Sequence, residues 1–392
     1  MNNFNNVIEK HIKDTSTPPE NITSNKLVKN LCIADSHPSK YLYVIGITGT
    51  NGKTTVSYLI GEVLKSAGYN PFVLGTLNSG NKDLSTPESI DISNFMKAHI
   101  KKGGTHFVME VTSEGIDQGR IDGIEFDMKL LTNITQDHLD YHKTFLNYKT
   151  TKLKFMSAGN AYKIYPEIFK KELVKFNTKL LGDFNLLNVK AAASALRYIG
   201  VEENFIKETL SSCMAPRGRL ESVDKGQPYL VLIDYAHTPD GLLNVLRTVK
   251  EIALSRGGRL LVLFGCGGDR DQGKRPKMGK IASNLADYIV ITEDNPRSED
   301  GREIMYQILD GVDSEFKNFV LIQDRARAIK FIINQARDND VVVLAGKGHE
   351  TYQILKSKVI QFDDKEQASI AISELSRLRE VCAINASNQL LN

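Results

Sequence analysis

Residues 41–55, YLYVIGITGTNGKTT, decide the fold. They open with a mostly apolar run, which is typical of a strand covered on both faces of a parallel sheet. A glycine-rich turn follows and leads into a helix, which we expect over residues 53–66. Backbone N–H groups of such a turn and of the helix N-terminus bind phosphate oxygens. Lys53 supplies a positive charge for the β- and γ-phosphates, and Thr54 can ligate Mg²⁺.

The spacing of this loop departs from the standard phosphate loop, G-x-x-x-x-G-K-[ST]. Counting back from Gly52, the first glycine position falls on Ile47, and Gly46 lies one residue earlier. A chance glycine-rich turn is therefore the alternative. The order of strand, loop, Lys-Thr pair and helix favours the phosphate loop.

Apolar runs of strand length alternate with helical stretches along the rest of the chain. In the first half we expect strands at 41–48, 71–76, 106–112 and 126–134, and helices at 53–66, 90–101 and 186–200. The last of these helices ends at Gly200, as a C-cap would. In the second half we expect strands at 229–236, 259–265, 287–292, 318–324 and 340–346, with helices between them. The signal is weak at 153–181, and we interpret 211–228 as a linker because it holds Ser, Pro, Gly and Arg.

Val, Ile and Leu runs separated by helices indicate parallel sheets that are covered on both faces. The predicted fold class is α/β, with a P-loop-type parallel-sheet ATPase domain followed by a Rossmann-like α/β domain. We expect a short N-terminal leader over residues 1–40, a central domain over 41–214 and a C-terminal domain over 215–392.

The composition is that of an ordinary globular protein, with 392 residues, 41% of them hydrophobic and 25% charged. The net charge of +3 is too small to indicate nucleic acid or an anionic membrane as a partner. No apolar run approaches the ~18–20 residues of a membrane span, and the N-terminus lacks the apolar core of a signal peptide. We therefore expect a cytoplasmic protein, and we expect a monomer. The four cysteines lack CxxC spacing, so neither a zinc site nor a disulfide framework is indicated.

The loop ITGTNGKTT (47–55) resembles the ATP loop of the Mur ligases, whose form is GTxGKT, and this form accounts for the position of the first glycine. Further matches follow in the family's order. They are MEVTSEG (109–115), LTNITQDHLDYH (131–142), GDFNLLN (182–188), PRGRLE (216–221), DYAHTPD (234–240), FGCGGDRDQGKRPKMG (264–279), TEDNPR (292–297) and GKGHE (346–350). The last four are most similar to the MurE type, which adds the third amino acid of the peptidoglycan stem to UDP-N-acetylmuramoyl-L-alanyl-D-glutamate.

The resemblance implies an enzyme, an ATP-dependent, ADP-forming acid–amino-acid ligase of peptidoglycan precursor synthesis. Such a ligase activates a carboxylate as an acyl phosphate and couples it to an amino acid. DNPR (294–297) resembles the form that adds meso-diaminopimelate. The implied partners are small molecules: ATP, the amino acid and a muramoyl-peptide-like acceptor. The implied cofactors are ATP and two Mg²⁺ ions, with a carbamylated Lys152 as an oxygen ligand.

The resemblance also implies roles for individual residues. The implied catalytic residues are Lys53, His138, Lys152, Arg219, Asp234 and His237. The implied nucleotide contacts are Gly49, Thr50, Asn51, Gly52, Lys53, Thr54, Thr55, Asn185, Asn188 and Arg219. The implied metal ligands are Thr54, Glu110, His138 and Lys152. The implied amino-acid contacts are Arg270, Asp294, Asn295, Arg297, Gly346 and Glu350, and the implied acceptor contacts are Ser85, Thr86, Thr112, Ser113, Gln118 and Arg120.

Several of these roles have a structural alternative. For Glu110 it is a strand-end cap or a surface charge, and for His138 a hydrogen-bonded structural histidine. For Lys152 it is a solvated helix lysine. Asn185 and Asn188 lie at a helix start, where side chains of this kind cap the helix.

Alternatives also remain for the C-terminal half. For Arg219, Asp234 and His237 the alternative is a structural ion network between the domains. An arginine such as Arg297 can grip a carboxylate through two parallel hydrogen bonds. Its alternative is a solvated side chain in a surface turn.

The chain departs from the family's pattern in three places. Only 40 residues precede the first strand, where the family has a UDP-binding domain, and the stretch between Lys152 and GDFNLLN is short. Glu114 stands where MurE-type enzymes usually have histidine. Two further hypotheses follow: a Mur-ligase-like enzyme that acts on a UDP-free acceptor in specialised peptide metabolism, and a non-catalytic ATP-binding regulatory protein.

Overall fold

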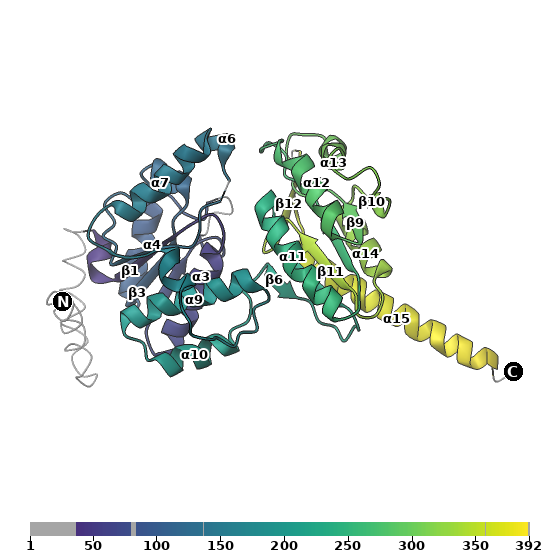
Figure 1. Ribbon diagram of the computed structural model, residues 1–392, viewed down its shortest axis with the longest axis horizontal. Helices are drawn as coiled ribbons and strands as arrows, with labels where there is room; N and C mark the ends of the chain where they lie inside the picture. The colour runs from purple at the N-terminus through teal and green to yellow at the C-terminus, as the bar shows by residue number, and fades with distance from the viewer. Residues whose placement is uncertain (1–36, 80–83, 136, 357, 391–392) are drawn as a thin grey trace.

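The computed structural model describes residues 37–79, 84–135, 137–356 and 358–390, which form two α/β lobes (Figure 1). Most of the expected leader lies outside the described residues. Within them, a short 3₁₀ helix, η1 (Pro38–Tyr41), leads into the first strand. The predicted α/β fold class is confirmed.

The first lobe is built on a five-stranded sheet with the strand order β2-β3-β1-β4-β5, and all neighbours are parallel. Its strands are β1 (Tyr43–Thr48), β2 (Pro71–Leu74), β3 (His106–Glu110), β4 (Met128–Leu131) and β5 (Tyr162–Ile164). The register places Ile47 between Glu110 and Leu130. The carboxyl ends of β1, β3 and β4 therefore meet at one edge, where sheets of this kind bind ligands.

Helices cover both faces of this sheet. They are α3 (Lys53–Ser66), α4 (Ser89–Lys101), α7 (Phe145–Ser157), α8 (Pro166–Lys170), α9 (Asp183–Ile199) and α10 (Glu203–Ser212), with the short α5 (Ser113–Asp117) and α6 (Leu139–His142) after β3 and β4. One core joins the sheet to α3, α8, α9 and α10, and the other joins it to α4 and α7. Val44 enters one core and Ile45 the other, so β1 must be apolar on both faces.

The second lobe has a six-stranded sheet with the order β10-β9-β8-β11-β7-β6. Its strands are β6 (Arg219–Ser222), β7 (Leu230–Asp234), β8 (Leu260–Phe264), β9 (Tyr288–Ile291), β10 (Phe319–Leu321) and β11 (Val341–Ala345). All neighbours are parallel except β6, which runs antiparallel to β7 at the edge. A separate hairpin of β12 (Tyr352–Leu355) and β13 (Lys358–Gln361) follows β11.

Five helices cover the second sheet. They are α11 (Pro239–Ser255), α12 (Lys274–Leu285), α13 (Gly301–Leu309), α14 (Arg325–Gln335) and α15 (Asp364–Leu390). The first three pack on one face, and α14 and α15 pack on the other. The far end of α15 extends beyond the lobe (Figure 1). None of the helices in the described ranges combines the length and the apolar composition that a bilayer crossing needs.

Several predicted boundaries agree with the structure. Helix α3 begins at Lys53 and ends at Ser66, and Gly200 caps α9 with a φ of 97°. The five strands expected in the second half are present as β7 to β11. The region of weak signal, 153–181, holds the end of α7 together with β5 and α8.

The linker expected at 211–228 is confirmed only for residues 213–218, which join α10 of the first lobe to β6 of the second. The segment contains the end of α10 and the edge strand β6, which pairs with β7 through Arg219 and Asp234. Only Leu220 of β6 is buried, and its register shifts after Arg219, so no apolar run or clean alternation marks the strand. The predicted domain boundary between 214 and 215 falls between α10 and β6 and stays a prediction.

The segment at the start of α9 packs against the second lobe. Leu181 and Phe184 belong to the first lobe but pack against the core of the second. Gly182 has a φ of 91°, and a Cβ there would lie 2.6 Å from Thr248 Cγ2 of α11. Glycine is therefore required where the lobes approach each other.

A buried ion pair ties α14 to α15. Arg325 donates to the two oxygens of Asp364 at 2.8 and 2.6 Å, and both side chains are fully buried. Arg325 also donates to the carbonyl oxygens of Glu293 and Ala345. The pair therefore fixes the helices of this face to the ends of β9 and β11.

Asp364→Asn is expected to lower the free energy of unfolding of the second lobe by about 3–5 kcal/mol, because it leaves a buried charge without its partner. Urea denaturation followed by circular dichroism measures this. Glu374→Gln is the matched control, because Lys330 and Glu374 join the same two helices at 2.7 Å on the exposed surface. It is expected to cost about 1 kcal/mol or less, and equal losses for the two variants would contradict the prediction.

Candidate functional site

The loop between β1 and α3 depends on two glycines. Gly49 and Gly52 have φ values of 149° and 86°. A Cβ would lie 1.8 Å from Thr132 Oγ1 at Gly49 and 2.3 Å from Asn188 Oδ1 at Gly52. Thr132 pins the loop, because its Oγ1 donates to the carbonyl oxygen of Asn51 at 2.6 Å. Helix α3 starts without a side-chain cap, which leaves its first N–H groups available to an anion.

Two lysines lie against this loop. Lys53 Nζ donates to the carbonyl oxygens of Gly49 and Thr50 at 2.9 Å each. Lys152 Nζ, from α7, donates to the same Gly49 oxygen at 3.0 Å and lies 4.8 Å from the ring centre of Tyr148. Burial and the charge of Lys53 lower the pKa of Lys152 well below its usual value. Lys152 is 1% exposed, so the alternative of a solvated lysine is wrong.

Glu110 ends β3 and is 1% exposed, so the alternative of a surface charge is wrong. Its carboxylate accepts hydrogen bonds from Thr54 Oγ1 at 3.0 Å and from the backbone and hydroxyl of Thr76 at 2.9 and 3.0 Å. Arg219 comes from the second lobe, donates to the same Thr54 hydroxyl at 3.3 Å and stacks on Tyr235. The structure therefore brings Thr54, Glu110 and Arg219 together.

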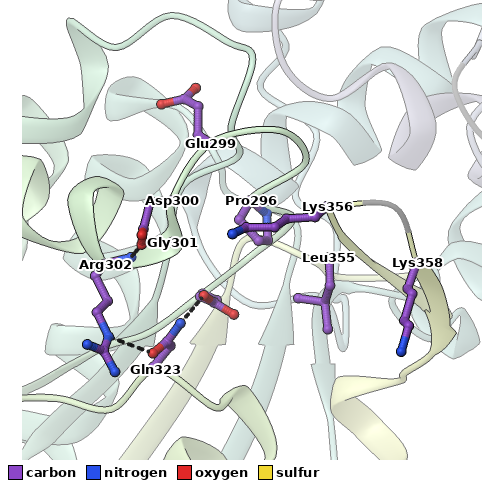
Figure 2. A pocket seen from close by; sticks show the side chains of 10 residues that line it. Pro296, Glu299, Asp300, Gly301, Arg302, Gln323, Leu355, Lys356 and Lys358 are labelled. Carbon is purple, nitrogen blue, oxygen red and sulfur yellow. Dashed lines mark hydrogen bonds between the residues drawn. The ribbon is translucent and has the colours of Figure 1, made fainter.

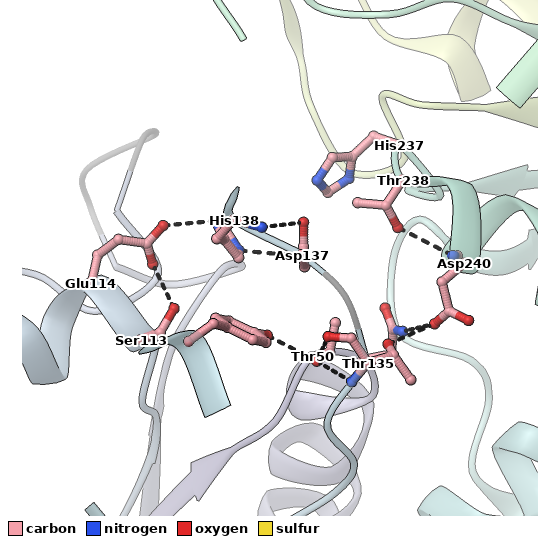
Figure 3. Close-up of polar contacts among 12 residues, drawn as sticks. Thr50, Ser113, Glu114, Thr135, Asp137, His138, His237, Thr238 and Asp240 are labelled. Carbon is pink, nitrogen blue, oxygen red and sulfur yellow. Dashed lines mark hydrogen bonds and ion pairs between the residues drawn. The ribbon is translucent and has the colours of Figure 1, made fainter. Parts of the chain in front are cut away.

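His138 lies in a second polar group, shown in Figure 3. Its Nδ1 is 2.7 Å from Glu114 Oε1, and its Nε2 is 3.4 Å from Asp137 Oδ2. Burial opposes the protonation of His138, but the hydrogen bond to Glu114 and the charge of Asp137 outweigh burial and raise its pKa. Burial would raise the pKa of Glu114, but the hydrogen bond and charge of His138 lower it to about 2. Glu114 therefore accepts the Nδ1 proton of His138, and the two side chains form an ion pair when the imidazole is protonated.

Oxygen donors suited to a metal ion gather at Thr54 and Glu110. Mg²⁺ prefers hydroxyl and carboxylate oxygens and completes its shell with water and substrate phosphates. Gly75 leaves room for the carboxylate, because a Cβ there would lie 2.2 Å from Glu110 Oε1. These donors fit a Mg²⁺ that nucleotide phosphates also hold. Over the described ranges, no three His, Cys, Asp or Glu side chains form a ligand set by themselves, and His138 lies with Glu114.

Asn185 and Asn188 are buried in the first two turns of α9. Asn188 Nδ2 donates to Asn185 Oδ1 at 3.1 Å, and Asn185 Nδ2 donates to the carbonyl oxygen of Leu181 at 2.8 Å. The capping alternative is wrong, because α9 follows Gly182 and has no side-chain cap. The contact of Asn188 with Gly52 places the pair beside the phosphate loop.

Asp234 is the last residue of β7, and His237 lies in the turn that follows. Both carboxylate oxygens of Asp234 accept backbone N–H groups, from Leu220 and Ala236, at 2.8 Å each. These bonds fix β6 and the turn after β7 within the second lobe, which is a structural role but not the ion network between the domains. His237 Nδ1 lies 2.9 Å from the carbonyl oxygen of Tyr235, and burial with a neighbouring lysine lowers its pKa to about 4. The ring is therefore neutral at neutral pH, and catalytic roles for both residues stay predictions.

Asp240 joins the lobes at the phosphate loop, although nothing in the sequence pattern assigns it a role. Its Oδ2 accepts hydrogen bonds from Asn51 Nδ2 at 2.7 Å and from Thr135 Oγ1 at 2.9 Å (Figure 3). It stands in the first turn of α11, which Thr238 caps. Because 189 residues separate it from Asn51, no local pattern carries a signal for this contact.

Most of the predicted amino-acid contacts gather beyond the ends of β9 and β11. Glu350 Oε2 accepts hydrogen bonds from Asn295 Nδ2 at 2.9 Å and from the buried Lys347 Nζ at 2.8 Å. Lys347 stands inside the GKGHE match, and sequence reasoning missed it. Asp294 packs against Gly346, where a Cβ would lie 2.6 Å from Asp294 Oδ2. Burial and the charge of Asp294 raise the pKa of Glu350.

The two arginines predicted to contact the amino acid, Arg270 and Arg297, both lie near Gly267. Arg297 has a φ of 53°, and its Nη1 donates to the carbonyl oxygen of Gly268 at 2.9 Å. Arg270 is exposed, and its Nη1 donates to the carbonyl oxygen of Asp269 at 3.3 Å. A Cβ at Gly267 would lie 2.9 Å from Arg297 Nη1 and 3.8 Å from Arg270 Cγ. Arg297 is half-buried and Arg270 stands at the rim.

A cavity of about 560 Å³ lies beside the DNPR turn (Figure 2). Pro296, Arg302, Gln323, Leu355 and Lys356 are among the residues that line it. None of the predicted substrate contacts lines it. The cavity is therefore separate from the amino-acid group.

The predicted acceptor contacts form a network around Thr86. Its Oγ1 donates to the carbonyl oxygen of Glu110 and accepts the N–H of Thr112, both at 2.9 Å. Arg120 donates to the carbonyl oxygen of Thr86 at 2.9 Å and to the side chain of Gln118. The network therefore begins at the predicted metal ligand Glu110.

Ser85 and Ser113 extend this network. Ser85 Oγ lies 2.8 Å from Thr76 Oγ1, which also donates to Glu110. Ser113 Oγ donates to Glu114 Oε2 at 3.4 Å. All six predicted acceptor contacts therefore belong to hydrogen-bond networks that include Glu110 or Glu114.

Comparison with protein families matches two parts of the chain. Residues 47–166 match the Mur ligase middle domain. Residues 218–348 match the family described as Mur ligase, glutamate ligase domain. The two matches coincide with the sheets of the two lobes.

Relatives named UDP-N-acetylmuramoyl-L-alanyl-D-glutamate–2,6-diaminopimelate ligase are similar over most of the chain. The one from Clostridium botulinum is 38% identical over 389 residues, which cover 86% of this chain and 80% of the relative. The one from Geobacter metallireducens is 36% identical, and the match covers 93% of this chain and 86% of the relative.

Solved structures agree with this grouping. A structure of a ligase of the same name is 31% identical with a TM-score of 0.55, covering 89% of this chain and 81% of that chain. E. coli FolC in complex with ADP shares the fold at 15% identity, with a TM-score of 0.59 over 95% of this chain and 98% of that chain. The chain therefore belongs to the Mur ligase family of ATP-dependent, ADP-forming peptide ligases.

Proposed function

We propose that this protein uses ATP to join meso-diaminopimelate to the glutamate carboxylate of UDP-N-acetylmuramoyl-L-alanyl-D-glutamate, in peptidoglycan precursor synthesis. Relatives named for this ligation are 36–38% identical to the chain. The observation that carries the proposal is the contact between the lobes at the phosphate loop, where Arg219 donates to Thr54 at 3.3 Å. It supports a reaction in which both lobes act on one triphosphate.

The proposed reaction has two steps. A carboxylate oxygen of the acceptor attacks the γ-phosphorus of ATP, the bond to ADP breaks, and an acyl phosphate forms. The amino nitrogen of the amino acid then attacks the acyl carbon and loses a proton, and inorganic phosphate leaves as the amide forms. The first step brings two anions together, so the site must supply positive charge at fixed positions.

Two cationic side chains supply that charge in our proposal. Lys53, which lies against the loop carbonyls, would turn to the β- and γ-phosphates. Arg219 would stabilise the charge that develops on the transferring phosphoryl group. Asn185 and Asn188 lie beside the same loop and would contact the nucleoside.

The proposed metal ligands follow from the oxygen donors. Thr54 and Glu110 would hold one Mg²⁺ together with the phosphates, and His138 and a carbamylated Lys152 would hold a second. Bound Mg²⁺ supplies electrostatic stabilisation of the transferring phosphoryl group. The observed contact between Thr54 and Glu110 supports the first site.

The environment of Lys152 supports its carbamylation. Only a neutral amine attacks CO₂; the nitrogen–carbon bond forms, a proton leaves, and an anionic carbamate results. Burial and the charge of Lys53 lower the pKa of Lys152, which favours the neutral amine. The carbamate is therefore expected to be lost as the pH falls below this lowered pKa.

Lys152→Ala is expected to lower kcat by about 100-fold or more, because the second Mg²⁺ would lose its anionic ligand and with it the charge that stabilises the phosphoryl group. Removal of CO₂ and bicarbonate should lower the activity of the wild type but not that of the variant. A carbamate carbon seen by ¹³C NMR with labelled bicarbonate checks the modification. Lys149→Ala, at an exposed position of the same helix, is the matched control and should match the wild type. Insensitivity of the wild type to CO₂ would contradict the prediction.

Lys53→Ala is expected to weaken ATP binding by about 10–100-fold, the value of a charge-assisted hydrogen bond. Isothermal titration with a non-hydrolysable ATP analogue measures it. Phosphate release from the wild type, with ATP, Mg²⁺, acceptor and meso-diaminopimelate, separates a ligase from a regulatory protein. Nucleotide binding without phosphate release under any acceptor would contradict the proposed function.

Arg297→Lys is expected to raise the KM for meso-diaminopimelate by about 10–100-fold, because lysine cannot make two parallel bonds to a carboxylate. The KM for ATP should stay unchanged. Arg302→Ala is the control, because Arg302 is exposed on the next helix and bonds to Gln323. Equal loss in both variants would argue against a carboxylate site at Arg297.

Acceptor identity is tested with two matched acceptors. The assay compares UDP-N-acetylmuramoyl-dipeptide with the same dipeptide acceptor lacking UDP. We expect phosphate release with the UDP form. Release with the UDP-free form alone would replace the proposal by a ligase of specialised peptide metabolism.

A further inference from the structure

We infer that Glu114 is a positioning residue for His138, which holds the imidazole by Nδ1 so that Nε2 is presented to a divalent cation. The inference rests on the proposed function, in which His138 ligates Mg²⁺. That proposal gives Glu114 itself no role.

The two nitrogens of the imidazole have different contacts. Glu114 Oε1 lies 2.7 Å from His138 Nδ1, and the Glu114 side chain is 23% exposed. Nε2 lies 3.4 Å from Asp137 Oδ2, a carboxylate that would also attract a cation on that side. A neutral imidazole that donates through Nδ1 carries its lone pair on Nε2. The contact with Glu114 therefore selects the tautomer that binds a metal ion through Nε2, as outer carboxylates do for metal-bound histidines.

Glu114 is itself held in place. It stands in the first turn of α5, where Thr112 caps the helix by accepting the N–H of Gly115 at 3.2 Å. Its second oxygen accepts a hydrogen bond from Ser113 at 3.4 Å (Figure 3). With both oxygens engaged, the carboxylate offers His138 a fixed acceptor.

His138 needs such an anchor. Its φ of 53° lies in the left-handed region, and no side-chain cap holds the start of α6. Its ring centre lies 6.1 Å from that of Tyr148, whose hydroxyl is 2.8 Å from Thr50 Oγ1 of the phosphate loop. The imidazole thus contacts Glu114 and lies beside Tyr148, which contacts the phosphate loop, and loss of the anchor would let the ring turn.

The test uses the full chain with a non-hydrolysable ATP analogue and Mn²⁺ as the metal probe, read by electron paramagnetic resonance. Glu114→Gln keeps the shape and removes the charge, whereas Glu114→Asp keeps the charge and withdraws it from Nδ1. His138→Ala reports which Mn²⁺ depends on His138. Asp117→Asn is the matched control, because Asp117 lies on the same helix and bonds to Tyr141 Oη at 2.9 Å. Nitrogen-15 NMR of the His138 ring reports the tautomer.

We expect both Glu114 variants to weaken the His138-dependent Mn²⁺ by about 10–100-fold, the usual effect of losing an outer-shell partner. Affinity for the ATP analogue should stay unchanged, and Asp117→Asn should match the wild type. When the ring is neutral, the wild type should carry its proton on Nδ1, and Glu114→Gln should show mixed tautomers. Thermal melting followed by circular dichroism checks that each variant folds.

The outcomes separate this inference from the proposed function. Wild-type Mn²⁺ affinity in both Glu114 variants, with affinity lost in His138→Ala, would overturn the inference alone. Full affinity in Glu114→Asp with loss in Glu114→Gln would mean that charge rather than position matters, and would also overturn it. Wild-type affinity in His138→Ala would remove the metal role of His138 and the inference together, while phosphate release would still report the ligase activity.

Discussion

One carbonyl oxygen, that of Gly49, accepts hydrogen bonds from two lysine side chains, and the rest of the site depends on this arrangement. Lys53 reaches it from α3 and Lys152 from α7. Burial disfavours both ammonium groups, and Lys53 further disfavours the charge on Lys152, so both pKa values are lowered. Nearby negative charge offsets part of this electrostatic cost, and Glu110 supplies some of that negative charge. The remaining positive potential makes an anionic ligand the natural complement of the loop.

Sheet geometry places the other groups around this loop. Because β1, β3 and β4 end at one edge, Glu110 and Thr132 reach the loop although they belong to different strands. The second lobe adds Arg219 from β6 and Asp240 from the start of α11. The set of charges around the phosphate loop is therefore completed only where the lobes meet.

The sequence predicted what local pattern controls. The run 41–48 marked β1 because burial on both faces demands apolar residues, and the glycines of the loop marked the turn that follows. Strand β6 was not predicted, because an edge strand with one buried side chain shows no hydrophobic pattern in the sequence. The contact between Asp240 and Asn51 spans 189 residues, and no periodicity records such a pairing. Glu114 stood out only as a departure from a family pattern, and its partner His138 became visible once β3 and β4 were placed in one sheet.

Asp240 links the two lobes at the loop where a nucleotide would bind. Its carboxylate accepts hydrogen bonds from the side-chain amide of Asn51 and from the hydroxyl of Thr135 at the phosphate loop. A triphosphate carries negative charge to the same place, and like charges at short range repel. Filling the loop therefore weakens this tether, and by thermodynamic reciprocity whatever loosens the tether favours the bound nucleotide. The contact between the lobes and the binding of nucleotide are therefore coupled.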